Sequence, residues 1–332
     1  MVRDHKALAC RVVLMVLSLH AVGALAQSSA VPAYPARPIR FVVPSTAGGS
    51  GDIFARTIGN ALSEKFGKQV VVDNRPGANG IVGCELVARS LPDGHTLLMG
   101  NSAWFVINPN LYRTLPYDAI ADFTPVTLGV VYGYVLVAHP SIGAATVADL
   151  IVLAKAKPGQ LTFGSTGLGA VNHLAGEMFK TITGTNLTHV PYKGSSAALA
   201  DVLAGQTSLM FDTPITSVPQ IRAGKLRALG LTLAKRTALL PEVPTLAEAG
   251  LKGYEVNSWQ AVMVPAATPR PVVEKLNAAI ISALKLPDVI DRLVVQGGNE
   301  IVAMPPAPFA ALIKDELGRY AKLISSVGLR LE

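Results

Sequence analysis

The sequence predicts an α/β fold in two lobes, each built on a largely parallel sheet. Short apolar segments alternate with helix-length segments, which is typical of parallel sheets. The apolar segments lack the polar–apolar alternation of half-exposed strands, so we expect helices on both faces of each sheet. The chain has 332 residues, more than one typical domain. The strand–turn–helix pattern also starts again near residue 162, which favours a second lobe.

The first lobe opens with a regular series of elements. We expect a strand, a helix, a strand, a helix and a strand over the segments 39–43, 52–66, 69–74, 79–90 and 95–100. The first of these helices has an apolar residue at every fourth position, and these residues share one side of it: Phe54, Ile58, Leu62 and Phe66.

A glycine-rich turn precedes a helix in each half of the chain. Each turn follows a strand and has a serine and a threonine before its glycines. The two turns consist of Ser45, Thr46, Ala47, Gly48, Gly49 and Ser50 in the first half, and of Ser165, Thr166, Gly167, Leu168, Gly169 and Ala170 in the second. We therefore expect one such helix start in each lobe.

Such a turn is suited to binding an anion. The first N–H groups of a helix have no partner within it, and the helix dipole adds partial positive charge there. Neither turn contains Lys or Arg, so a small carboxylate is favoured over a polyphosphate. The alternative is that both are simply tight, well-capped turns, with Ser50 or Asp52 as the cap or the first-turn acid.

The N-terminal segment 1–26 has the pattern of a secretory signal peptide. A basic start is followed by an apolar run and by Ala24-Leu25-Ala26. A membrane anchor is the alternative, but the apolar run is short and contains Ser18 and His20. We expect a cleaved signal and export to the periplasm.

Composition limits the classes of function. The net charge of +7 is spread along the chain without a basic run interleaved with aromatics, so we expect no nucleic-acid binding. The signal peptide contains Cys10, so Cys84 alone would remain after cleavage; this excludes an intramolecular disulfide, and we expect it to be a buried apolar residue. The histidines lack metal spacing, and we expect no metal and no cofactor.

Motifs for catalysis are missing. No G-x-S-x-G nucleophile motif, P-loop or G-x-G-x-x-G occurs. His173, just inside the second helix, can donate to a ligand or brace the turn, and bracing is favoured. Asp212 follows an apolar strand, where it can hold an amino or hydroxyl group of a ligand or only cap the next turn. Tyr192 also follows a strand and can line the same cleft or be an ordinary half-buried tyrosine.

The sequence resembles a known family over essentially the whole mature chain. The resemblance rests on segments in the same order as in that family, among them YPARPIRFVVPSTAGGSGDIFAR, VVDNRPGANG, PDGHTLLMG, FGSTGLGAVNHLAGEMFK, HVPYKGSSAALADVLAGQ and LPEVPTLAEAGLKGYEVNSW. The family is that of the periplasmic solute receptors of tripartite tricarboxylate transporters, called Bug proteins.

The resemblance implies a two-lobed periplasmic binding protein of the second type. Each lobe would be a mixed, mostly parallel sheet flanked by helices, and the chain would cross between lobes near 128–136 and 256–262. The implied domains are 1–26 as signal peptide, 27–130 with 259–332 as the first lobe, and 131–258 as the second.

The resemblance also implies a receptor and not an enzyme. A small carboxylate (a dicarboxylate, tricarboxylate, acidic amino acid or aromatic acid) would be gripped between the lobes and delivered by a monomer to an inner-membrane permease. The implied ligand-binding residues are Thr46, Ala47, Gly48, Gly49, Ser50, Asp52, Ser102, Ser165, Thr166, Gly167, Tyr192, Phe211 and Asp212. To these the sequence adds Ser45, in the first turn, and His173 as candidates. A receptor serving a signalling partner, or an exported α/β enzyme, is the alternative.

Three positions depart from the family pattern. Ser45 stands where an aromatic residue is common, Ala170 where a serine is frequent, and Gln260 where an aromatic residue is usual. We expect these changes to affect which ligand is bound rather than the fold.

Overall fold

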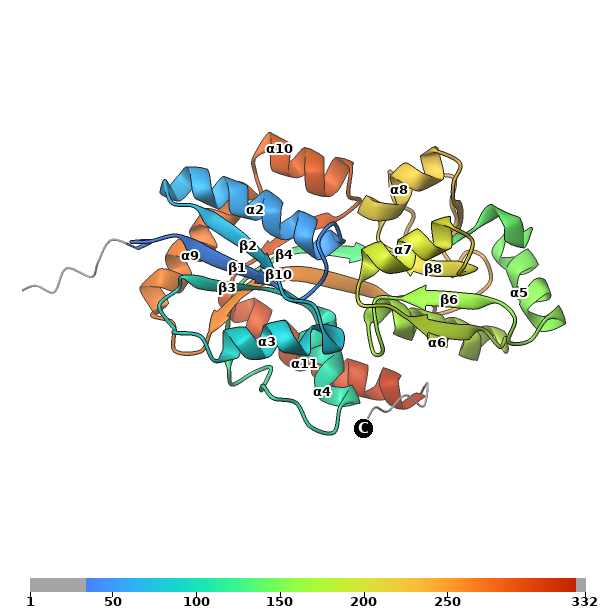
Figure 1. The fold of residues 1–332 in the computed structure, drawn as a ribbon, viewed down its shortest axis with the longest axis horizontal. Coiled ribbons are helices and arrows are strands. Elements are labelled where there is room, and N and C mark those ends of the chain that lie inside the picture. Colours follow the sequence, from blue (N-terminus) through green and yellow to red (C-terminus); the bar gives the residue numbers. More distant parts are fainter. Residues whose placement is uncertain (1–33, 327–332) are drawn as a thin grey trace, which may run out of the picture. The chain divides into compact units, whose positions relative to one another are not determined.

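The computed structural model describes residues 34–326, and the compact unit that carries all of their helices and strands begins at Arg37. The expected signal peptide, 1–26, lies outside the described residues. Two sheets organise this unit (Figure 1). Among the residues described, no helix combines the length and the apolar character that crossing a membrane requires.

The first lobe is built on a six-stranded sheet in the order β11-β4-β10-β3-β1-β2. Its strands are β1 (Ile39–Val43), β2 (Val70–Asn74), β3 (Thr96–Asn101), β4 (Phe123–Gly133), β10 (Asn257–Pro265) and β11 (Glu300–Met304). Its helices are α2 (Ser50–Phe66), α3 (Ile81–Ala88), α4 (Asn108–Leu111), α9 (Arg270–Ala283), α10 (Pro287–Ile290) and α11 (Pro306–Ser326). The apolar side expected for the first helix is confirmed in part, because Phe54, Ile58 and Leu62 are fully buried.

The second lobe is built on a five-stranded sheet in the order β7-β6-β8-β5-β9. Its strands are β5 (Val135–Ala138), β6 (Thr162–Ser165), β7 (Thr188–Pro191), β8 (Leu209–Asp212) and β9 (Arg227–Leu231). Its helices are α5 (Val147–Ala156), α6 (Val171–Thr183), α7 (Ser195–Leu203) and α8 (Pro214–Arg222).

The predicted two-lobed α/β fold with mixed sheets is confirmed, but the sheets contain fewer parallel pairs than expected. Four strand pairings are parallel and five are antiparallel. The antiparallel pairs involve β4, β5 and β10, at the points where the chain passes from one sheet to the other. In four of these pairs one strand is β5 or β10, which the chain enters from the other lobe without a helical crossover from its neighbour, so this strand is free to run antiparallel.

The chain changes sheet between β4 and β5 and again between β9 and β10. Thr232 joins these two passages and is fully buried. Its Oγ1 accepts from the Tyr134 N–H at 2.8 Å and donates to the Val256 carbonyl at 2.6 Å. The Thr232 N–H also donates to the Tyr134 carbonyl, and the Val256 N–H donates to the Thr232 carbonyl. The exact lobe limits at 130–131 and 258–259 remain predictions.

We expect Thr232→Val to destabilise the protein by about 1–3 kcal/mol, because it keeps the shape but leaves a buried N–H and a buried carbonyl without a partner. Urea unfolding measures the change. Thr57→Val is the matched control: the Thr57 hydroxyl bonds only to the Ile53 carbonyl of its own helix, so we expect little effect. Equal stability of the two variants would contradict the role given to Thr232.

Candidate functional site

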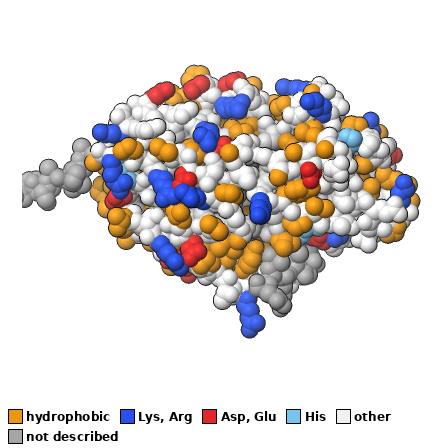
Figure 2. Space-filling model, viewed as in Figure 1, with side chains coloured by type: hydrophobic (Ala, Val, Ile, Leu, Met, Phe, Trp, Pro, Cys, Tyr) orange, Lys and Arg blue, Asp and Glu red, His pale blue; other side chains and the backbone are white. Residues whose placement is uncertain are grey.

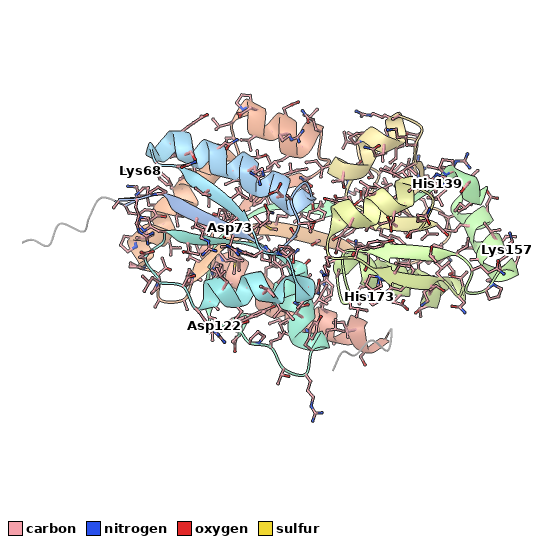
Figure 3. The ribbon with its side chains drawn as sticks, viewed as in Figure 1. Lys68, Asp73, Asp122, His139, Lys157 and His173 are labelled. Carbon is pink, nitrogen blue, oxygen red and sulfur yellow. The ribbon has the colours of Figure 1, made fainter. Side chains whose placement is uncertain are left out.

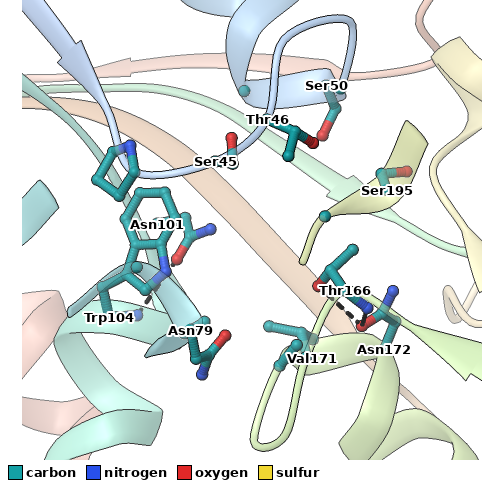
Figure 4. Close-up of a pocket in the computed structure, with 18 of the residues that line it drawn as sticks. Ser45, Thr46, Ser50, Asn79, Asn101, Trp104, Thr166, Val171, Asn172 and Ser195 are labelled. Carbon is teal, nitrogen blue, oxygen red and sulfur yellow. Dashed lines mark hydrogen bonds between the residues drawn. The ribbon is translucent and has the colours of Figure 1, made fainter. Parts of the chain in front are cut away.

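Both glycine-rich turns line one cavity of about 330 Å³ between the lobes. Figure 4 shows Thr46 and Ser50 on one side of it and Thr166 and Asn172 on the other. The structure therefore brings together the two helix starts that the sequence singled out. Of the predicted site residues, the following line the cavity: Ser45, Thr46, Gly49, Ser50, Thr166, Gly167, Tyr192 and Asp212. The others do not line it: Ala47 and Gly48 are exposed at the first turn, and five are buried behind the cavity wall, Asp52, Ser102, Ser165, His173 and Phe211.

Asp52 shapes the first turn from behind. Its side chain is almost fully buried, and its Oδ2 accepts from the Gly48 N–H at 2.9 Å and from Arg56 Nε at 3.0 Å. Burial acts to raise the pKa of Asp52, but the Arg56 and Gly48 hydrogen bonds outweigh it and hold the pKa below its ordinary value. An ionised Asp52 thus fixes the left-handed Gly48 (φ 77°) and sets the direction in which α2 starts.

The second turn is held by a similar set of internal bonds. Asn172 Oδ1 accepts from both the N–H and the hydroxyl of Thr166, each at 3.2 Å. Ser165 Oγ donates to the Gly167 carbonyl at 3.0 Å and lies 2.6 Å from His189 Nε2. Ser165 is fully buried, so it supports the turn instead of facing the cavity.

His173 braces this turn, as favoured from the sequence. Its Nδ1 accepts from the Gly169 N–H at 3.0 Å, and its ring stacks on that of His189 with centroids 3.8 Å apart. Figure 3 labels His173 on α6 and His139 well apart from it. Burial lowers the pKa of His173 to about 3 and that of His189 to about 4, and the charge of Lys180 acts in the same direction.

The low pKa values of this histidine pair predict that the fold loses stability as the pH falls. Unfolded imidazoles take up protons below about pH 6.5, whereas the folded pair stays neutral until much lower pH. The stability that the pair contributes is therefore present above pH 6.5 and is lost as the pH falls toward 4. We expect His173→Asn, which keeps an acceptor for Gly169, to flatten the pH dependence of unfolding free energy in this range, with His139→Asn as the control. An unchanged slope in His173→Asn would contradict this account.

The other predicted residues that lie behind the cavity belong to the core of a lobe. Ser102 is fully buried, and its hydroxyl lies 2.6 Å from that of Ser258 on β10. Phe211 is also fully buried and stacks with Tyr254 at 6.3 Å between ring centroids. Strand alternation explains Phe211, because the next residue, Asp212, points to the opposite face of the sheet and lines the cavity.

Asp212 and Tyr192 line the cavity with their polar groups already bonded. Asp212 accepts from Ser195 Oγ at 2.9 Å and from Thr216 Oγ1 at 2.7 Å. Burial raises the pKa of Asp212 to about 6 in spite of these bonds. The Tyr192 hydroxyl donates to Asp201 at 2.7 Å, so its polar group already has a partner within the second lobe.

Two further helix starts, which the sequence analysis missed, also reach the cavity. Gly77, Ala78, Asn79 and Gly80 precede α3, and Lys193 and Gly194 precede α7; all six line the cavity. The signal was in the sequence, since RPGANG and YKGSS are also glycine-containing helix entries. They were passed over because no Ser-Thr pair stands in front of their glycines.

Aromatic side chains form much of the remaining wall. They come from different elements and were not predicted as a group: Trp104, Tyr112, Tyr132 and Tyr134. Tyr132 and Tyr134 flank the point where the chain first changes sheet, and their rings lie 5.6 Å apart. Gln260 also lines the cavity from β10, opposite Asn101 in the strand register. The passages between the lobes thus form part of the cavity wall.

The two lobes touch at the edges of the cavity. Ser196 Oγ of the second lobe donates to the Ala47 carbonyl of the first at 2.9 Å. A side-chain carbon on Gly194 would collide with Thr46, and one on Gly169 would collide with Leu111. These close approaches across the cavity define a closed arrangement of the lobes, and they explain two of the glycines in the second lobe.

Charge is scarce in the cavity. Among the described residues that line it, Lys193 and Asp212 are the only charged ones. The part of the chain that the structure describes holds no cluster of metal-binding side chains. On the outer face in Figure 2, the Lys and Arg side chains are scattered among acidic ones rather than gathered in a patch. The cavity can therefore bind a small anion through neutral donors.

The two sheets, the two passages between them and the cavity they enclose define a two-lobed solute-binding protein. Residues 54–329 match the family model described as tripartite tricarboxylate transporter family receptor. The chain belongs to this family, and the resemblance to the Bug receptors is confirmed. Receptors of this family are periplasmic solute-binding proteins, not enzymes.

Individual relatives agree with this assignment. The chain is 35% identical over 300 residues to Protein BugT of Bordetella pertussis (strain Tohama I), covering 90% of this chain and 92% of BugT. The R. palustris protein Rpa4515, solved with adipate, has a TM-score of 0.87 and 37% identity, covering 90% of this chain and 99% of that one. MatC from Rhodopseudomonas palustris, solved with bound malate, has a TM-score of 0.83 and 31% identity. The match covers 88% of this chain and 100% of MatC.

Proposed function

We propose that this protein captures a small carboxylate between its lobes in the periplasm and delivers it to the membrane component of a tripartite tricarboxylate-type transporter. Residues 1–26 direct export and are cleaved, and the mature chain acts as a monomer. It uses no cofactor and does not bind nucleic acid. One observation carries the proposal: glycine-rich helix starts from both lobes converge on a cavity lined by few charged side chains.

Capture follows from the physics of the helix starts. The first N–H groups of α2 and α6 have no partners within their helices, so they are available to a carboxylate in the cavity. A carboxylate that touches both lobes binds the closed form better than the open form, and this difference in affinity shifts the population toward closure. The transporter would then recognise the closed receptor.

The size of the acid and its substituents are set by residues that differ from the family pattern. Ser45, Ala170 and Gln260 all line the cavity. The adipate and malate bound by Rpa4515 and MatC support a small dicarboxylate or a related acid as the ligand class. Ser45 and Ala170 leave room where a larger or more polar residue would stand, and Gln260 adds an amide.

A thermal-shift screen of the chain from residue 27 onward tests the proposal. Small mono-, di- and tricarboxylates, acidic amino acids and aromatic acids form the panel, and neutral sugars and nucleoside phosphates are the controls. An acid present at about 100 times its dissociation constant should stabilise the fold by about 2.7 kcal/mol. The proposal fails if no acid raises the melting temperature, or if a bound acid is consumed.

A further inference from the structure

Three carboxamide side chains in the cavity have fixed orientations, and one of them is reversed. Asn101 Oδ1 accepts from the Trp104 N–H at 3.2 Å, and Asn172 Oδ1 accepts from the Thr166 N–H. A backbone N–H can only donate, so both oxygens are committed to the protein. The Nδ2 groups of Asn101 and Asn172 are left as donors for a ligand carboxylate.

Asn79 has the opposite orientation. Asn108 Nδ2 donates to the Asn79 backbone carbonyl at 3.2 Å, and a carbonyl can only accept. Asn108 Oδ1 must therefore be the acceptor for Asn79 Nδ2, at 2.8 Å. Asn108 is fully buried, so it holds this arrangement firmly. Asn79 Oδ1 is left as the free end of the side chain, and Figure 4 shows it directed into the space between the lobes.

The backbone of Asn79 is also unusual. Its φ of 48° and ψ of 45° lie in the left-handed region, which asparagine adopts more readily than other non-glycine residues. The fold keeps an asparagine there, between Ala78 and Gly80. Asn79 Oδ1 lies within 4 Å of the position that a Cβ would take on Gly167, so it faces the turn of the opposite lobe. Asp212, on the far wall, is a second acceptor.

We infer that Asn79 determines specificity by accepting a hydrogen bond from the ligand, so that the preferred acid carries a hydroxyl or ammonium group beside its carboxylate. This rests on the proposed function, because it assumes a carboxylate in the cavity. An unsubstituted acid has only acceptor atoms at neutral pH. Its oxygens or its methylene groups would face Asn79 Oδ1, which loses its water and gains no partner.

Matched pairs of acids test this inference by isothermal titration: malate and aspartate against succinate, 2-hydroxyglutarate and glutamate against glutarate, and lactate and alanine against propionate. We expect the substituted member of the best-binding set to bind at least about tenfold more tightly than the unsubstituted one. Comparison within a set also separates hydroxyl from ammonium as the donor.

Asn79→Gly removes the acceptor while suiting the left-handed backbone. We expect it to bring the ratio of the two dissociation constants within a set close to one, mainly by weakening the binding of the substituted acid. Ala267→Gly is the control, because Ala267 also has a positive φ (62°) but does not line the cavity; it should keep the preference.

The outcomes separate the two proposals. If acids bind but the unsubstituted member binds as tightly, or if Asn79→Gly keeps the preference, the role of Asn79 is wrong and the receptor function stands. If no acid in any set or in the wider panel binds, the receptor function itself fails.

Discussion

Asn172→Asp is expected to lower the affinity for the captured acid by at least about a hundredfold, because like charges brought together at a binding site cost several kcal/mol. The substitution is isosteric. Its remaining oxygen still accepts from the Thr166 N–H and hydroxyl, while the donor Nδ2 becomes a negatively charged oxygen. Isothermal titration with the acid found in the panel measures the loss.

The fold should survive this change. Asn172 is the second residue of α6, and an acidic side chain in the first turn of a helix is favourable. We therefore expect the melting temperature without ligand to stay at or above that of the wild type. Asn186→Asp, at an exposed position of the second lobe, makes the same change of net charge and should bind normally. Wild-type affinity in Asn172→Asp would mean that the start of α6 does not contact the ligand.

The largest effect on stability is expected at Trp259, where Trp259→Ala should cost about 3–5 kcal/mol. Trp259 lies on β10 just after the second change of sheet and is almost fully buried. Its ring packs edge-on against Phe309 at 5.2 Å, and its Nε1 donates to Glu316 at 2.7 Å. It therefore joins β10, on which the chain returns to the first lobe, to α11. Chemical unfolding of the apo protein measures the loss.

Trp259→Phe separates the two parts of this contribution. It keeps an aromatic ring but removes the donor from Glu316, whose carboxyl group is largely buried and has its pKa raised by that burial. Losing only this hydrogen bond should cost about 1–3 kcal/mol. If Trp259→Ala is no worse than Trp259→Phe, packing at this position contributes little and our account of the anchor is wrong.

Local pattern was enough to predict the elements and the two helix starts. The strand predicted over 39–43 is β1 without change, because its apolar run is bounded by a glycine-rich turn. The starts of α2 and α6 were found because strand, turn and helix signals occur within a few residues of each other. Such features depend on neighbours in sequence, and a single sequence carries that information.

Which face of each element meets the cavity was not predictable in the same way. Asp52, Ser165 and Phe211 lie next to lining residues in sequence but point behind the cavity wall. Tyr132, Tyr134 and Gln260 line it from strands that carry no motif. Their positions depend on how β4 and β10 pair and pass between the sheets, which is decided by contacts between residues far apart in the chain.

By itself the sequence determined that this protein has two lobes, and that a helix in each begins with backbone N–H groups suited to an anion. Tertiary structure alone decided that the starts of α2, α3, α6 and α7 share one cavity, and that Asn79 presents an oxygen to it where Asn101 and Asn172 present nitrogens. The physical reason is that a helix start is a local property of the backbone. The direction of a carboxamide is set by its partner, and Asn79 has its partner, Asn108, in a different element.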